Sequence, residues 1–273
     1  MKNKLNRRLR AMVAVLAAAL LTLTGCISAM AEAQPEGTNV RVTIVGENGQ
    51  VVMAAKEIAV TDADSDGALT IDDALYAAHE AAYNGGAAAG YSTAMTDYGK
   101  SLTKLWSVEN GGSYGYYVND ASAFSMDDPV KDGDYICAFV YTDLTGFSDA
   151  YSYFDVKSAN VKAGEEVRLT LSYISFDENW NPVVNPLAGA VITVDGKETD
   201  IVTGDDGSAA VSAGNGEHVI SAATNGLVIV PPVCVLTAAS AGLATGWYIV
   251  IAAAAVILIA AVVLVIVKSK KKK

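Results

Sequence analysis

Aspartates recur at alternate positions of one short stretch, DADSDGALTIDD, which covers residues 62–73. Positions one, three and five of the stretch are aspartates, position six is glycine and position twelve is aspartate again. This is the spacing of an EF-hand calcium loop, with Asp in place of the terminal Glu. Calcium binds about six to eight oxygen atoms. The residues expected to supply them here are Asp62, Asp64, Asp66, Ala68 through its carbonyl, Thr70 and Asp73.

The same stretch has a second interpretation, in which it is a solvated acidic turn. Thr70 stands directly before a run with helical periodicity, and Asp73 follows three residues later. This is the arrangement of a helix N-cap and its capping-box partner. The calcium interpretation is preferred because six of the expected positions fit, but the residue types at positions nine and twelve suit both.

The loop resembles the calcium repeat of dockerins, which also carry Asp at the last position. A dockerin has two such repeats, whereas this chain has one. The segment before it, residues 53–60, favours a strand over a helix. We therefore expect calcium binding here without the cohesin partner of a dockerin.

Catalysis and nucleic-acid binding are not expected. The two histidines, His79 and His218, fall in different predicted domains and lie near no nucleophile signature, and His79 is expected at the surface or at a boundary. All 30 acidic residues lie within residues 32–217, together with only nine basic ones. A segment this acidic repels phosphates and attracts divalent cations.

Both ends of the chain predict membrane targeting. Residues 1–31 combine a basic start with a short apolar run and are typical of a secretory signal peptide. Two processing sites remain open: a lipobox that ends at Cys26, and cleavage after Ala31, which we prefer. Residues 247–267 contain no charge and are long enough for a transmembrane helix. The lysine-rich tail, residues 268–273, should stay in the cytoplasm by the positive-inside rule.

The segment between these ends is long enough for two domains. In residues 32–156, alternating valines and isoleucines predict a hairpin, and IDDALYAAHEAAY predicts a helix that begins at Ile71. A strand over residues 150–156 is expected to close this domain. Residues 157–237 contain short strands separated by Asp-Gly turns, and residues 238–246 form a linker.

The first domain resembles a family of surface-protein domains related to the C-terminal domain of transcobalamin and intrinsic factor. The resemblance rests on TIDDAL, on Gly115-Tyr-Tyr-Val-Asn119 and on VKDGDYICAFVY. It implies a small α+β, β-grasp-like fold and makes a corrinoid one candidate ligand. The second domain is similar to the Ig-like or transthyretin-like modules of bacterial surface proteins, which implies a β-sandwich stalk.

Tyrosines are concentrated in the first domain, and most are expected to fill its core. Tyr114, Tyr116 and Tyr117 are the best candidates for exposure, where they could face a glycan, a corrinoid or a protein ligand. Cys137 and Cys234 lie in apolar runs and are expected to be buried free thiols rather than a disulfide.

The sequence thus predicts a mainly β or α+β protein with one C-terminal transmembrane helix. The expected function is that of a non-enzymatic bacterial cell-surface protein, anchored in the cell membrane, with a calcium-stabilised head on an Ig-like stalk. Surface capture of a corrinoid or glycan for uptake is the alternative.

Overall fold

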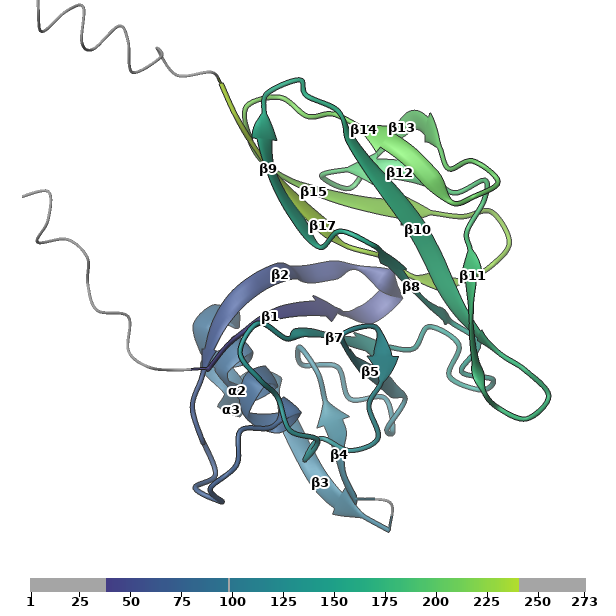
Figure 1. The fold of residues 1–273 in the computed structure, drawn as a ribbon. Coiled ribbons are helices and arrows are strands. Elements are labelled where there is room, and N and C mark those ends of the chain that lie inside the picture. The colour runs from purple at the N-terminus through teal and green to yellow at the C-terminus, as the bar shows by residue number, and fades with distance from the viewer. Residues whose placement is uncertain (1–37, 98, 241–273) are drawn as a thin grey trace, which may run out of the picture. The chain divides into compact units, whose positions relative to one another are not determined.

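The described part of the protein is mainly β, with two short α-helices and several sheets that mix parallel and antiparallel pairing. The structure is a computed structural model that describes residues 38–97 and 99–240, all within one compact unit (Figure 1). The mainly β prediction is therefore confirmed.

The first half is built on a five-stranded sheet in the order β2-β1-β7-β5-β6, in which β1 and β7 are parallel (Figure 1). Its elements are β1 (Thr38–Val45), η2 (Glu47–Gly49), β2 (Val51–Val60), α2 (Ile71–Ala82), α3 (Gly86–Gly90), β3 (Ser92–Thr96), β4 (Gly99–Lys104), β5 (Tyr114–Val118), β6 (Ala121–Ser122) and β7 (Tyr135–Val140). The predicted hairpin and helix are present, whereas β3 and β4 form a separate two-stranded ribbon.

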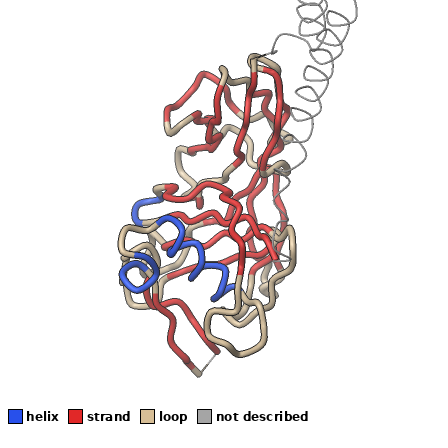
Figure 2. Tube along the Cα trace, turned by 90° about the vertical axis from the view of Figure 1, so that its left-hand side faces the viewer, coloured by secondary structure: helices blue, strands red, loops and turns tan. Residues whose placement is uncertain are grey.

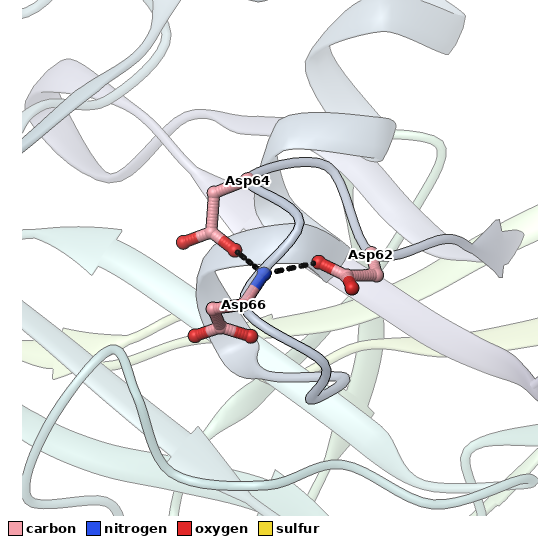
Figure 3. Close-up of side chains that lie close together, drawn as sticks. All are labelled: Asp62, Asp64 and Asp66. Carbon is pink, nitrogen blue, oxygen red and sulfur yellow. Dashed lines mark hydrogen bonds between the residues drawn. The ribbon is translucent and has the colours of Figure 1, made fainter.

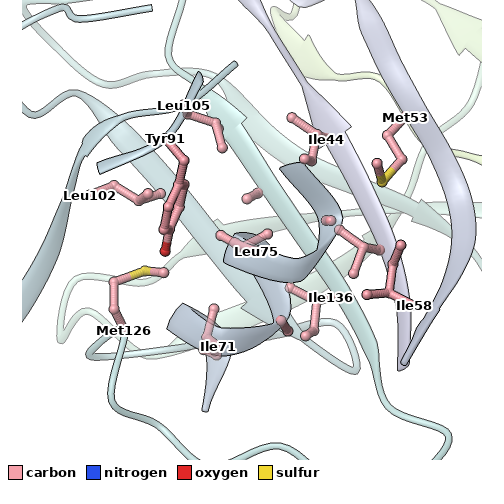
Figure 4. Close-up of a cluster of buried hydrophobic side chains, with 14 of the residues drawn as sticks. Ile44, Met53, Ile58, Ile71, Leu75, Tyr91, Leu102, Leu105, Met126 and Ile136 are labelled. Atoms are coloured by element: carbon pink, nitrogen blue, oxygen red, sulfur yellow. The ribbon is translucent and has the colours of Figure 1, made fainter. Parts of the chain in front are cut away.

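Helix α2 covers one face of this sheet, and Figure 2 shows its neighbour α3 on the same side of the molecule. Ile71, Leu75 and Ala78 recur at helical spacing and are fully buried. They pack with alternate residues of the central strands, such as Ile44 and Ile136 (Figure 4). Burial of a side chain the size of Ile71 or Leu75 stabilises the fold by about 1.5–3 kcal/mol, so this core holds α2 against the sheet.

The second half contains two sheets that enclose a separate core. Its strands are β8 (Ala150–Phe154), β9 (Ser158–Lys162), β10 (Val167–Phe176), β11 (Pro182–Pro186), β12 (Val191–Val194), β13 (Lys197–Val202), β14 (Ser208–Val211), β15 (Gly216–Ala223), β16 (Ile229–Val230) and β17 (Cys234–Ala239). One sheet has the order β11-β10-β8-β16, with β14 also paired to β10, and the other has the order β13-β12-β15-β17-β9. Leu169 and Leu171 of the first sheet share a core with Ile192 and Ile220 of the second.

Strand β8 corrects one expectation. It was expected to close the first domain, but it pairs with β10 and β16 of the second half. The two halves also share a third core, in which Phe139 of β7 and Tyr151 of β8 pack with Ile174 of β10. The face of the first sheet that α2 leaves free is therefore covered by the second half.

Both cysteines that the structure describes, Cys137 and Cys234, are buried free thiols, as predicted. Burial raises the pKa of Cys137 to about 12 and that of Cys234 to about 11, which keeps both thiols protonated. The predicted signal peptide, transmembrane helix and basic tail lie outside the described residues. Within residues 38–240, no helix is long and apolar enough to cross a membrane.

Candidate metal centre

Three carboxylates converge in the loop between β2 and α2. Asp62, Asp64 and Asp66 each place one oxygen so that the three oxygens lie within 4.8 Å of one another (Figure 3). The backbone N–H of Asp66 donates to Asp62 Oδ1 at 3.1 Å and to Asp64 Oδ1 at 3.3 Å. Gly67 follows with φ at 89°, a conformation that favours glycine, and its N–H donates to Asp62 Oδ2 at 2.9 Å. The loop thus gathers three exposed carboxylates, a donor set that suits a hard cation such as calcium.

The last two predicted side-chain ligands form the N-cap of α2. Thr70 accepts a hydrogen bond from the N–H of Asp73, and Asp73 Oδ2 accepts from the N–H of Thr70 at 3.0 Å and from its hydroxyl at 2.9 Å. Asp73 Oδ1 accepts from the N–H of Ala63 at 2.8 Å, and both Thr70 and Asp73 are buried. The capping-box interpretation therefore holds for these two residues. Both carboxylate oxygens of Asp73 already have partners, and this residue is not in the converging group.

Ala68 was expected to contribute its carbonyl. It lies in the exposed part of the loop, and its N–H donates to Asp66 Oδ1 at 2.8 Å. This contact orders the chain directly after the three carboxylates. Ala68 is thus placed beside the carboxylate group, whereas Thr70 and Asp73 belong to the helix cap.

The spacing of the loop did not reveal Lys100, which stands beside it on β4. The Nζ of Lys100 lies 3.1 Å from Asp64 Oδ2, 2.9 Å from Asp72 Oδ2 and 2.9 Å from Asp127 Oδ1. These carboxylates raise the pKa of Lys100, and the hydrogen bond from Lys100 lowers the pKa of Asp64. A metal ion at the loop would therefore share Asp64 with a fixed ammonium group.

The expected exposure of the tyrosines was wrong for two of the three residues. Tyr114 is 8% exposed, and its hydroxyl lies 2.9 Å from the carbonyl oxygen of Thr103. Tyr117 is 7% exposed, with its ring stacked on that of Tyr151 at 3.8 Å, and burial raises its pKa to about 12. Tyr116 is half-buried. Tyr117 lies on the sheet face that the second half covers, whereas Tyr114 belongs to the core on the opposite face, under α2.

His79 is fully buried rather than at the surface. Its Nδ1–H donates to the carbonyl oxygen of Leu75 at 2.6 Å, and its Nε2 accepts from the N–H of Trp106 at 3.1 Å. Burial lowers the pKa of His79, so the ring remains neutral near pH 7. Both ring nitrogens are occupied by backbone groups, and the residue acts as a packing and hydrogen-bonding group.

The described structure is that of a mainly β protein with an acidic loop at the start of helix α2. Comparisons with protein-family models, curated proteins and solved structures found no match to the chain. The resemblances drawn from the sequence therefore stay predictions, and a functional assignment depends on the chain's own residues.

Proposed function

We propose that the protein is a non-enzymatic bacterial cell-surface protein whose first domain is stabilised by calcium. The single observation that carries the calcium proposal is the convergence of Asp62, Asp64 and Asp66 at loop positions one, three and five. Calcium is the hard cation for which this spacing is typical, and the surrounding acidic surface favours its approach.

The ligand set that we propose is smaller than that of a full EF-hand. Asp62, Asp64 and Asp66 would bind by side chain and Ala68 by its carbonyl, with water completing the shell. Thr70 and Asp73 would join only by giving up the helix cap. A site with few charged ligands belongs among the weaker extracellular ones, with a Kd of roughly 10⁻⁴–10⁻³ M. At about 1 mM calcium, binding to the native state alone would add roughly 0.4–1.4 kcal/mol to the free energy of unfolding.

The finer fold assignment is part of the same proposal. A hairpin, a helix and a later strand parallel to the first strand support a β-grasp-like domain that ends before β8. Two sheets around one core, with β8 among their strands, support an Ig-like sandwich that begins at β8 rather than at residue 157. The anchored topology rests on the sequence of residues 1–31 and 247–273. Capture of a corrinoid or glycan stays a prediction from the sequence.

The calcium proposal is tested by thermal unfolding of the ectodomain, residues 32–246, in calcium and in chelator. Calcium should raise the melting temperature of the wild type by a few degrees, since about 1 kcal/mol shifts a domain of this size by roughly 2–4 °C. The double variant Asp62→Ala, Asp66→Ala should lose this shift, whereas Asp205→Ala, an exposed acid in another loop, should keep it. If millimolar calcium leaves the melting temperature of the wild type unchanged and no heat of binding is measured, the loop is an acidic turn and not a calcium site.

Protease treatment of intact cells tests the topology. Peptides from residues 38–240 should be released, while residues 268–273 stay protected. Recovery of residues 38–240 from the cytosol instead would contradict the surface location.

A further inference from the structure

Exposed apolar side chains gather at one end of the sheet β11-β10-β8-β16. Twelve large apolar side chains are exposed among the described residues, and eight of them belong to three segments at this end. The segments are the β10–β11 hairpin, the loop before β8 and the loop before β16 (Figure 1). We call this surface the apolar end.

The strand register brings the three segments together. Ser152 of β8 pairs with Tyr173 of β10, so the loop that precedes β8 lies beside the far end of β10. Ala150 pairs with Ile229 in parallel, so the loop that precedes β16 lies at the same end, and the N–H of Ala150 donates to the carbonyl oxygen of Val228 at 2.9 Å. The three segments therefore lie together at this end of the sheet. Its exposed apolar members are Leu144, Phe147, Phe176, Trp180, Val183, Val184, Leu227 and Val228.

Trp180 is the most exposed of these side chains, at 82%, and it stands at the tip of the hairpin. Its φ of 63° is unfavourable for a bulky residue, yet the turn holds it there. Asp177 Oδ1 accepts from the N–H groups of Asn179 and Asn181, each at 2.8 Å, and the Trp180 N–H donates to the Asp177 carbonyl at 3.0 Å. The ring of Phe176 lies 6.3 Å from the Trp180 ring. The two aromatic rings are therefore presented to solvent by an ordered turn.

Strand addition does not explain this surface. β11 is an edge strand, but Pro182 and Pro186 stand at its two ends and lack the N–H that a neighbouring strand would need. An approaching partner would meet side chains rather than a free ladder of backbone groups.

The charges at the apolar end have one sign. The three segments, residues 142–149, 171–186 and 224–231, contain no lysine or arginine. Asp177 and Glu178 are exposed beside the rings, and Asp143 is partly exposed in the loop before β8. Acidic side chains beside exposed aromatic rings complement cations and repel an anionic membrane.

We propose that the apolar end docks a protein partner whose apolar contact face carries lysine or arginine side chains. A cation over the Trp180 ring gains both the attraction of the aromatic face and that of the neighbouring carboxylates. Tryptophan is among the residue types that supply most of the binding energy of protein interfaces. This docking surface contains no residue of the Asp62–Asp73 loop, so it goes beyond the calcium proposal and does not depend on it.

The test uses the full-length chain in nanodiscs of neutral lipid and two synthetic helical peptides. One peptide contains leucine and lysine, and the matched peptide has glutamate at every lysine position. The leucine–lysine peptide should bind, and Trp180→Ala should weaken this binding at least about tenfold. Phe124→Ala removes an aromatic side chain that is equally exposed elsewhere and should leave binding unchanged. Chelator should have no effect on any of these results.

Three results would overturn the proposal. The first is equal binding of the lysine peptide by wild type and Trp180→Ala, with both variants shown to be folded by circular dichroism. The second is equal binding of the two peptides, which would remove the role of charge. The third is Trp180-dependent association of the chain with itself or with added vesicles of neutral phosphatidylcholine, with no binding of the lysine peptide.

Discussion

Replacement of Asp120 by alanine should destabilise the protein by about 2–4 kcal/mol, because it leaves a largely buried ammonium group without its carboxylate. Lys157, which follows β8, donates from Nζ to Asp120 Oδ1 at 2.7 Å and to the carbonyl oxygen of Phe154 at 2.9 Å. The same Nζ lies over the rings of Tyr135 and Tyr153, at 4.8 and 4.6 Å from their centroids. This site joins the turn after β5 to the start of the second half.

The magnitude follows from the burial of the pair. Loss of one partner from a fully buried ion pair costs about 3–5 kcal/mol. The side chains of Lys157 and Asp120 are 16% and 22% exposed, so water reaches them and lowers the cost. The double variant Asp120→Ala, Lys157→Met should recover part of the loss, since it removes the uncompensated charge as well. Glu109→Ala, which breaks a pair whose acid is 64% exposed, should cost less than about 1 kcal/mol.

Equilibrium unfolding of the ectodomain in guanidinium chloride measures these differences at pH 7 and pH 9. Burial lowers the pKa of Lys157, and the hydrogen bond to Asp120 opposes that shift. Asp120→Ala should therefore lower this pKa further. A lysine whose pKa is lower in the folded state costs stability while it is charged, and the cost is relieved as pH rises through that folded pKa. The difference in the free energy of unfolding between wild type and Asp120→Ala should therefore be smaller at pH 9 than at pH 7. The reasoning would be refuted if Asp120→Ala lowered the free energy of unfolding by less than about 0.5 kcal/mol. It would also be refuted if the double variant were as unstable as Asp120→Ala alone.

Three further predictions concern the rest of the fold. Residues 39–156 expressed alone should unfold at a lower denaturant concentration than residues 32–246, because Ile174 and Val230 no longer cover Phe139. Equal unfolding midpoints would show that the shared core contributes nothing to stability. Burial lowers the pKa of His79, so its contribution to stability is present above the unfolded pKa of about 6.5 and is lost as pH falls through the lower folded pKa. His79→Gln should flatten that acid slope in unfolding experiments, and an unchanged slope would assign it to other groups. Gly207→Ala should lower the free energy of unfolding, measured with denaturant, by more than about 2 kcal/mol. The added Cβ would lie 2.3 Å from the carbonyl oxygen of Leu171, at a residue whose φ is 75°. A loss of less than about 1 kcal/mol would mean that the backbone relaxes to make room for it.

Local spacing was enough to predict the acidic loop, and tertiary contacts were needed for the rest of the site. Alternation of aspartates predicts convergence of Asp62, Asp64 and Asp66 because they belong to one turn. Lys100 lies 36 residues beyond Asp64, and only the fold of β4 brings the two together. Thr70 and Asp73 fit a metal site and a helix cap equally well in the sequence; the hydrogen bonds establish the cap, and metal binding by these two residues stays a prediction.

The errors in the exposure of the tyrosines have one physical origin, which is that both faces of the first sheet are covered. Strand β7 reads YICAFV, and all six of its residues are buried. Alternate members face α2 or the second half, as Ile136 and Phe139 do. A continuous apolar run of this length is expected for a strand buried on both sides. Tyr117 lies on the same sheet face as Phe139, so it is buried by the second half as well.

The contacts around the loop also decide what a bound ion could do. One end of the loop is fixed to the helix cap through Asp73 and Ala63, and its middle is fixed to β4 through Asp64 and Lys100. A switch needs a segment with two arrangements of similar energy, each favoured by one ligation state. A loop held at both points has little freedom to rearrange, so calcium would act mainly by reducing repulsion among its carboxylates. The expected effect of calcium is therefore on the stability of α2 and its core rather than on a distant binding surface.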